Sequence, residues 1–327
     1  MVALNCIGID VSKDKLDTNL LRPNGKQKEK SFDNTASGHG KLLVWAQTLT
    51  GEESRHFAME ATGSYSNALS SFLAEQRETV SVINPARVKY YGIVQGVLNK
   101  TDRADARLIA QFCQVVKPEP WRQSSPAVAL LSALTHRRQQ LVEQRVAETN
   151  RLAQPGLPKV VRQSIEKTIG YLKEEIAEID KAISEHIEHD PHLKADHKLL
   201  TSIPGIGDIL SSVMLAELPT LSECTDSSAI GSYAGLSPRE HRSGTSVHHT
   251  TRISKSGNAT LRSALYLPAM SAMRYNPLVK EFYDRLVGRG MCRKAAVCAA
   301  MRKLLMIAVG ILKNRIPFDP NFISSRP

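Results

Sequence analysis

The chain has 327 residues, 42% of them hydrophobic, which is enough for two or three domains with real cores. A formal net charge of +11 favours a polyanionic partner, nucleic acid before a membrane surface, while only 5% aromatic residues make phosphate contacts more important than base stacking. Cysteines without C-x-x-C spacing argue against a zinc site or a disulfide framework, and neither a signal peptide nor an apolar run of ~18 residues is found. We therefore expect a cytoplasmic, nucleoid-associated protein with no membrane partner.

The first third of the chain has the pattern of an α/β domain. A strand is expected to end at Asp10, and a second apolar run, Leu16 to Leu21, leads through the turn Arg22-Pro23-Asn24-Gly25 into a third strand, Lys28 to Phe32. A helical period around Lys41–Trp45 follows, and then a strand, a helix and a strand at His56–Glu60, Ser64–Gln76 and Thr79–Ile83. Three meandering strands followed by alternating helices and strands indicate a ribonuclease-H-like fold.

Four acidic residues stand where solubility does not explain them: Asp10, Glu60, Asp102 and Asp105. Asp10 and Glu60 end apolar runs, and Asp102 and Asp105 would share one face of a helix. A carboxylate at the end of a buried strand is costly unless it is neutralised, and Mg²⁺ prefers oxygen ligands. We predict that the four hold two Mg²⁺ ions ~3.5–4 Å apart.

Simpler readings of these acids exist. Asp102 and Asp105 could merely favour a helix N-terminus. Asp10 could be the strand-end aspartate of an actin-like ATP-binding fold, but Asp10-Val11-Ser12 lacks the glycine that such a phosphate loop needs.

The middle of the chain is helical from about Ala127 to His189, with a break around Gln154–Pro158. The second helix carries apolar residues at alternating spacings of four and three, which is a heptad seam: Ile165, Ile169, Leu172, Ile176, Ile179 and Ile183. The seam predicts either a helical hairpin within the chain or an interface between subunits, and both can hold.

The last third combines a glycine turn with many basic residues. The turn Ser202–Gly207, between two helical stretches, matches the hairpin of a helix-hairpin-helix motif that contacts phosphate, although a plain turn is the alternative. The segment from Arg239 to Lys303 holds thirteen basic residues against Glu240, Glu281 and Asp284. Such a run is often only a solvated face, but this imbalance favours a nucleic-acid surface.

Short motifs stand in a fixed order along the chain. The first half of the pattern is Ile7-Gly8-Ile9-Asp10-Val11-Ser12-Lys13, Glu60-Ala61-Thr62-Gly63-Ser64-Tyr65, Asn84-Pro85 and Lys100-Thr101-Asp102-Arg103-Ala104-Asp105-Ala106. The second half is Ile203-Pro204-Gly205-Ile206-Gly207, Ala234-Gly235-Leu236-Ser237-Pro238, Ser243-Gly244-Thr245-Ser246, Ile253-Ser254-Lys255-Ser256-Gly257 and Leu261-Arg262-Ser263-Ala264-Leu265-Tyr266. Taken together, these motifs resemble those of the DEDD insertion-sequence transposases, a family of bridge-RNA-guided serine recombinases to which the pilin-gene DNA invertases are related.

The resemblance implies a RuvC-like DEDD catalytic domain over residues 1–120, a helical coiled coil over 121–195, and a mainly α C-terminal transposase domain over 196–327. It implies Asp10, Glu60, Asp102 and Asp105 as catalytic metal ligands and Ser243 as a nucleophile that forms a phosphoserine intermediate, with Ser246 as the nearby competitor. It also implies a homo-oligomer, a dimer or tetramer, that acts on target and donor DNA with a guide (bridge) non-coding RNA. In the family the serine and the carboxylates are thought to meet across subunits.

Two other functions stay open at this point. One is a RuvC-like hydrolytic nuclease that resolves branched DNA without a covalent intermediate. The other is a basic architectural DNA-binding protein that needs no metal carboxylates. We assign no role to His248 and His249, and we expect Trp45 and Trp121 to pack in a core or between domains rather than to stack on bases.

Overall fold

The structure is a computed structural model that describes residues 4–61, 63–96, 102–121, 123–218, 227–239, 242–243, 247–248 and 252–321. The chain divides into two compact units, Met1–Gln123 and Ser124–Pro327. For some residues in these ranges the structure describes the backbone but not the side chain, and Asp102 and Ser243 are among them. The three-part division expected from the sequence stays a prediction, because the helical hairpin and the C-terminal elements form one unit.

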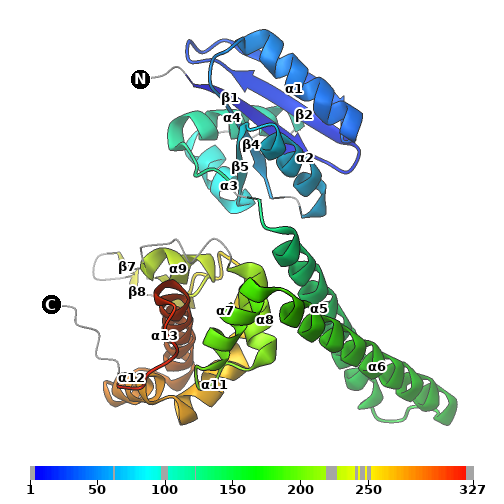
Figure 1. Ribbon diagram of the computed structural model, residues 1–327, viewed down its shortest axis with the longest axis vertical. Coiled ribbons are helices and arrows are strands. Elements are labelled where there is room, and N and C mark those ends of the chain that lie inside the picture. The colour runs from blue at the N-terminus through cyan, green and yellow to red at the C-terminus, as the bar shows by residue number, and fades with distance from the viewer. Residues whose placement is uncertain are drawn as a thin grey trace. The chain divides into compact units, whose positions relative to one another are not determined.

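A five-stranded mixed sheet organises the first unit, with strand order β3-β2-β1-β4-β5 (Figure 1). The first three strands are antiparallel neighbours, whereas β4 is parallel to both β1 and β5. The strands are β1 (Asn5–Val11), β2 (Lys15–Leu21), β3 (Gln27–Asp33), β4 (Arg55–Glu60) and β5 (Thr79–Ile83). Each strand predicted from the sequence is present within one residue of its expected end, and this mixed α/β unit is consistent with a ribonuclease-H-like fold.

Turn chemistry explains the first hairpins. Gly25 adopts φ +81°, a left-handed conformation that glycine enters without strain, and its N–H donates to the carbonyl of Arg22. The N–H of Ser12 donates to the carbonyl of Lys15 at 2.9 Å, which closes the tighter turn between β1 and β2. Both turns fix the register of the three antiparallel strands.

The helices of the first unit cover both faces of the sheet. Ile7, Ile9, Phe57 and Met59 pack in one core with residues of α1 and α2. Cys6 and Ala58, which alternate with them along the strands, pack in a second core with residues of α3 and α4. The helices are α1 (Ala36–Thr50), α2 (Ser64–Glu75), α3 (Pro85–Val94) and α4 (Asp102–Val116).

The interior of the first unit corrects one detail of the sequence analysis. β2 departs from the apolar run expected there, because its centre holds the polar residues Asp17, Thr18 and Asn19, and all three are almost completely buried. Trp45 packs as expected, with its ring edge-to-face against Phe32 at 5.6 Å between centroids.

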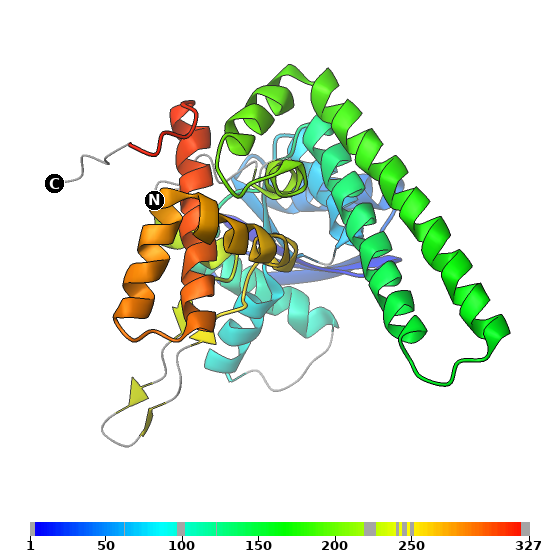
Figure 2. The ribbon, with the colours of Figure 1, turned by 90° about the horizontal axis from the view of Figure 1, so that it is seen from below.

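The second unit is mainly helical. Two long helices, α5 (Pro126–Leu152) and α6 (Lys159–His189), lie antiparallel and side by side (Figures 1 and 2). Its other helices are α7 (Pro191–Thr201), α8 (Asp208–Glu217), α9 (Ser227–Tyr233), α10 (Ala259–Ala264), α11 (Tyr266–Tyr275), α12 (Pro277–Gly288) and α13 (Arg293–Asn314). Its short strands form two pairs, β6 (Pro238–Arg239) with β9 (Arg252–Ile253), and β7 (Arg242–Ser243) with β8 (Val247–His248).

The heptad seam of α6 is used inside the chain. Leu172 and Ile176 are buried against Leu141 of α5, and Ile183 joins the main core of the second unit. Arg138 of α5 donates to the carboxylate of Asp180 on α6, with 2.5 Å between Nε and Oδ1. The predicted hairpin is therefore confirmed, while a role of this pair in subunit contacts stays a prediction.

One helix changes the sequence-based expectation about apolar runs. Among the residues that the structure describes, α13 is long and apolar enough to cross a membrane by length and composition. Half of its apolar window is nevertheless buried in the protein, where Ala300, Leu304, Leu305 and Ala308 belong to the core of the second unit. Its length and apolarity are those of a central core helix.

Candidate active site

The ends of β1 and β4 place two of the predicted acids side by side. The two strands are parallel, and their register pairs Ile9 with Met59, one residue before Asp10 and Glu60. Neighbouring strands lie ~4.8 Å apart, so the two acids start from adjacent backbone positions. Both alternate with residues of the α1 and α2 core, which puts them on the opposite face of the sheet, the face that α4 covers.

Gly8 lets α4 approach this face of β1 closely. A Cβ atom at Gly8 would lie 2.1 Å from the carbonyl oxygen of Ala106 and 2.3 Å from the backbone nitrogen of Ala110. Both distances are far below any van der Waals contact, so only glycine allows the helix backbone to touch the strand here. The close packing of α4 on β1 therefore explains why the motif Ile7-Gly8-Ile9-Asp10 contains a glycine.

The contacts along β1 also show which part of α4 faces Asp10. Cys113 packs with Cys6 in one core, and Ala106 and Ala110 lie against Gly8, so α4 runs in the opposite direction to β1. Two residues of a strand advance ~6.6 Å, at ~3.3 Å per residue. Four to five residues of a helix advance about the same distance, at ~1.5 Å per residue. One such step beyond Gly8 reaches Asp10 on the strand and the first turn of α4 on the helix, where Asp102 and Asp105 stand.

The site gathers oxygen donors, which is the donor chemistry that Mg²⁺ requires. Asp10, Glu60 and Asp105 are each partly buried, and each has interaction partners in the structure. Within the part of the chain that the structure describes, no three His, Cys, Asp or Glu side chains lie close enough to hold an ion as placed. The side chain of Asp102 lies outside that part, so the magnesium site of four carboxylates stays a prediction that the oxygen-donor chemistry of these residues suits.

The sequence analysis missed a fifth carboxylate on the same face. Asp17 of β2 stands directly opposite Asp10 in the antiparallel pair of β1 and β2, and only 3% of it is exposed. The signal that could have found it is the short turn between the strands: counting back from Ser12 and on from Lys15 pairs Asp10 with Asp17.

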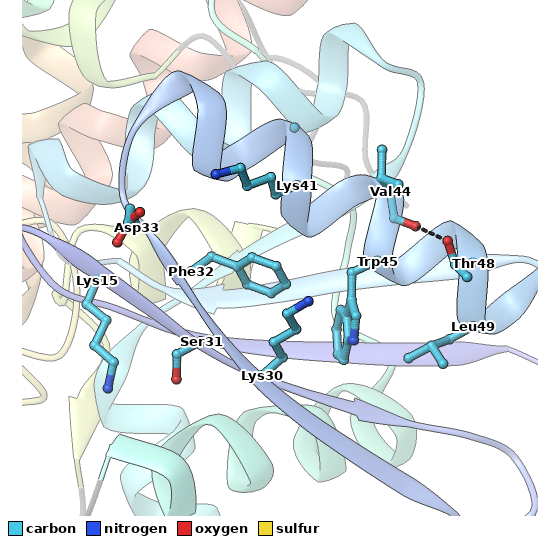
Figure 3. A pocket seen from close by; sticks show the side chains of 11 residues that line it. Lys15, Lys30, Ser31, Phe32, Asp33, Lys41, Val44, Trp45, Thr48 and Leu49 are labelled. Carbon is cyan, nitrogen blue, oxygen red and sulfur yellow. Dashed lines mark hydrogen bonds between the residues drawn. The ribbon is translucent and has the colours of Figure 1, made fainter.

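A hollow of about 1000 Å³ lies on the other side of the sheet, between β3 and α1. Figure 3 shows Lys30, Phe32 and Trp45 lining it. Because Phe32 belongs to the core of the α1 and α2 face, this hollow is separate from the face that carries Asp10 and Glu60.

The predicted nucleophile lies in the second unit. Ser243 belongs to β7, and its backbone pairs with Val247 of β8. Its side chain is not among the described ones, and Ser246, the competitor, lies outside the described residues altogether. The assignment of Ser243 as nucleophile thus stays a prediction.

Basic residues gather next to this segment. Arg239 of β6 and Arg252 of β9 are exposed and directly opposite each other in an antiparallel pair. Like charges in such a pair repel, which an anion bound between them would relieve. Lys255, two residues beyond β9, is exposed and adopts φ +55°, a left-handed conformation that is uncommon for lysine. These observations fit a surface that contacts phosphate.

The glycine turn at Ser202–Gly207 joins α7 to α8, as expected. Gly205 adopts φ +104°, and a Cβ atom there would lie 2.6 Å from the Cβ of Ala272 on α11. The Nδ2 of Asn276 also donates to the carbonyl of Pro204 at 3.3 Å. Packing against α11 thus accounts for Gly205, and phosphate binding by this turn stays a prediction.

Comparison with known proteins finds insertion-sequence transposases and a DNA-inverting protein among the relatives of this chain. Residues 7–155 match the DEDD transposase family model of the IS110 type, described as a transposase, and residues 197–284 match the Transposase IS116/IS110/IS902 family. The chain is 33% identical to a pilin gene-inverting protein of Moraxella bovis over 316 residues, which cover 96% of this chain and 97% of that protein. It is 25% identical to the transposase for insertion sequence element IS1111A of Coxiella burnetii over 305 residues, 84% of this chain and 79% of that protein.

Proposed function

This chain belongs to the IS116/IS110/IS902 family of insertion-sequence transposases and is a DNA transposase or recombinase, and we propose that it cuts and rejoins DNA strands with Asp10, Glu60, Asp102 and Asp105 as ligands of magnesium. The single observation that carries the proposal is the contact at Gly8. That contact supports a common face for the strand-end acids and the first turn of α4.

The chemistry that the carboxylates require follows from the substrate. A phosphodiester is an anion, so its attack by an oxygen nucleophile builds up negative charge that needs compensation. Two bound Mg²⁺ ions would supply positive charge to the attacking and leaving oxygens. Asp10 and Glu60 would hold them from the sheet, and Asp102 and Asp105 from α4. The partial burial of Asp10, Glu60 and Asp105 supports this role, because it limits competition from water.

We further propose Ser243 as the nucleophile. Its Oγ would form an ester bond with the scissile phosphorus while the bond from phosphorus to the leaving deoxyribose oxygen breaks. The serine proton leaves, and the departing oxygen gains one, so no other reactant is needed. The phosphoserine ester keeps the energy of the broken bond, and a hydroxyl of the new strand can reverse the step without ATP. The resemblance to the family supports this step.

Denaturing gels after reaction with labelled DNA test the serine step. The parent and Ser246→Ala should leave protein covalently attached to DNA, and Ser243→Ala should not. If Ser243→Ala attaches and joins DNA like the parent, the assignment is wrong.

A hydrolytic nuclease acting on branched DNA is the alternative. It is favoured by one observation: all four acids lie in the first compact unit, which does not contain Ser243. This alternative expects strand cleavage without any covalent product, and cleavage that Ser243→Ala leaves unchanged.

We also propose a guide RNA and a homo-oligomer as partners. The family resemblance supports both, and the paired Arg239 and Arg252 supply a surface that phosphates of either nucleic acid would suit. Protein purified from cells that carry the gene with its flanking DNA should contain one discrete RNA encoded in that flank. Sedimentation of this material before and after ribonuclease treatment gives the subunit number and shows whether it depends on RNA.

A further inference from the structure

We propose that Asp17 is a positioning residue of the carboxylate site, whose buried negative charge raises the affinity of Asp10 and its partners for a divalent cation. The inference rests on the proposed function, since it presupposes that the acids hold a metal ion. We assign Asp17 no ligand role, because Ser31 and Lys15 hold its two carboxylate oxygens.

The pairing of three neighbouring strands places Asp17 beside Asp10, on the same face of the sheet. β1 and β2 pair Asp10 with Asp17, and β2 and β3 pair Asp17 with Ser31. Residues paired across antiparallel strands project from the same face, so all three side chains belong to the face of α4. Figure 3 agrees: Lys15 and Ser31 point away from α1, whereas Lys30 and Phe32 point toward it.

The same row of residues meets the first turn of α4. One row back, Gly8 pairs with Asn19, and Asn19 with Glu29. Arg107 of α4 forms an ion pair with Glu29 at 2.6 Å, which puts this row at the level of Arg107. The residues Asp10, Asp17 and Ser31 lie two residues further along the strands, in the direction from Gly8 to Asp10. At ~3.3 Å per strand residue and ~1.5 Å per helix residue, they lie level with the turn of α4 that begins with Asp102.

The carboxylate of Asp17 is held by a hydrogen bond and an ion pair. Ser31 Oγ donates to its Oδ1 at 2.5 Å, and Lys15 Nζ to its Oδ2 at 2.8 Å. The side chain of Lys15 is 51% exposed, whereas that of Asp17 is only 5% exposed. Solvent therefore screens the lysine more than the carboxylate, so Lys15 offsets only part of the negative field that Asp17 exerts at Asp10.

This charge has a consequence for cation binding. The Cβ atoms of two residues opposite each other lie ~4.5–5.5 Å apart, so ionised Asp10 and Asp17 repel. A divalent cation at Asp10 relieves that repulsion and gains attraction to both charges. Removing the charge of Asp17 should weaken cation binding, and removing the screening charge of Lys15 should strengthen it.

The affinity of the purified full-length protein for manganese tests these two predictions. Electron paramagnetic resonance measures it by counting the free aqueous ion. We expect Asp17→Asn to weaken binding roughly 10–100-fold, as changes next to metal ligands do. Lys15→Met should tighten binding. Asp33→Asn is the matched control: it removes one carboxylate from the neighbouring strand, where Asp33 is exposed and paired with Lys15, and should leave affinity unchanged. A merely structural role of Asp17 would lower thermal stability without these opposite shifts.

Asp10→Asn separates the failure of this inference from failure of the proposed function. If Asp10→Asn binds manganese as the parent does, the metal site itself is wrong. If Asp10→Asn loses binding but Asp17→Asn and Lys15→Met keep the parent affinity, only the role of Asp17 is overturned. Should Asp17→Asn fail to fold, Lys15→Met decides alone, and an unchanged affinity in that variant contradicts the inference.

Discussion

Gly8 is the residue through which β1 and α4 meet, and it can be tested by adding a single methyl group. Because a Cβ there would collide with backbone atoms of Ala106 and Ala110, Gly8→Ala should force α4 away from the strand. We expect it to lower the free energy of unfolding by about 1–3 kcal/mol, as overpacking does. Denaturant unfolding followed by tryptophan fluorescence measures this, since Trp45 and Trp121 both lie in the first unit.

Gly40→Ala is the matched control for that substitution. Gly40 lies inside α1, and a Cβ there would meet nothing within 4 Å. Alanine should therefore raise stability by about 0.5–1 kcal/mol, because it favours the helix. Equal effects of the two substitutions would contradict the packing argument.

The buried side chain of His56 should make the first unit less stable at acidic pH. Burial lowers the pKa of His56 below its ordinary value of 6.5, and its Nε2 lies 2.8 Å from Ser81 Oγ across β4 and β5. On acidification below about pH 6.5 the unfolded chain takes up a proton that the folded chain refuses, so stability present above that pH is lost.

The measurement is the free energy of unfolding between about pH 7.5 and about pH 5. The loss on acidification should be smaller in His56→Gln than in the parent, while His192→Gln, at an exposed position, should keep the parent profile. His39, whose pKa burial also lowers, should contribute the part that remains. A parent profile unchanged by His56→Gln would rule out this source of acid sensitivity.

The location of Asp17 beside the predicted site is an example of a feature that the sequence pattern did not reveal. Strand ends with acids are visible as patterns, because Asp10 and Glu60 interrupt apolar runs. Asp17 stands inside such a run, and its meaning depends on which residue lies opposite, which only the register of the hairpin gives. The role of Ser243 could not be read from spacing at all, and its assignment comes from resemblance.

At the scale of elements, the pattern was most reliable where one face of an element is buried. The strands of the first unit follow the sequence closely, since alternation and the turn at Gly25 both constrain them. The expected absence of a long apolar run did not extend to α13, because a core helix packed on several sides is apolar nearly all round. Composition alone cannot separate such a helix from one in a membrane.

The hairpin of α5 and α6 offers a test at this scale. Ile176 is buried between the two helices, whereas Val160, near the start of α6, is 78% exposed. Ile176→Ala should lower the stability of the hairpin by about 2–5 kcal/mol through the cavity it leaves. Val160→Ala should change it by less than about 0.5 kcal/mol. Hydrogen exchange over both helices reads out the loss, and equal protection in the two variants would contradict the predicted packing.

At the scale of the whole molecule, the two units carry different parts of the proposed chemistry. The first holds the carboxylates on one face of a mixed sheet, and the second holds Ser243 and the exposed pair Arg239 and Arg252. The heptad seam of α6 allowed an interface between subunits but did not fix the subunit number. Nucleic-acid partners could be expected only from charge and resemblance.

The most direct test of the central claim is strand cleavage and rejoining on a supercoiled plasmid that carries the gene with its native flanking DNA. We predict activity with Mg²⁺ in the parent and in Asp33→Asn, loss of activity with a chelator, and a loss of at least about 100-fold in Asp10→Asn, since one metal ligand is removed. Cleavage by Asp10→Asn at the parent rate, or full activity in the presence of the chelator, would contradict the account.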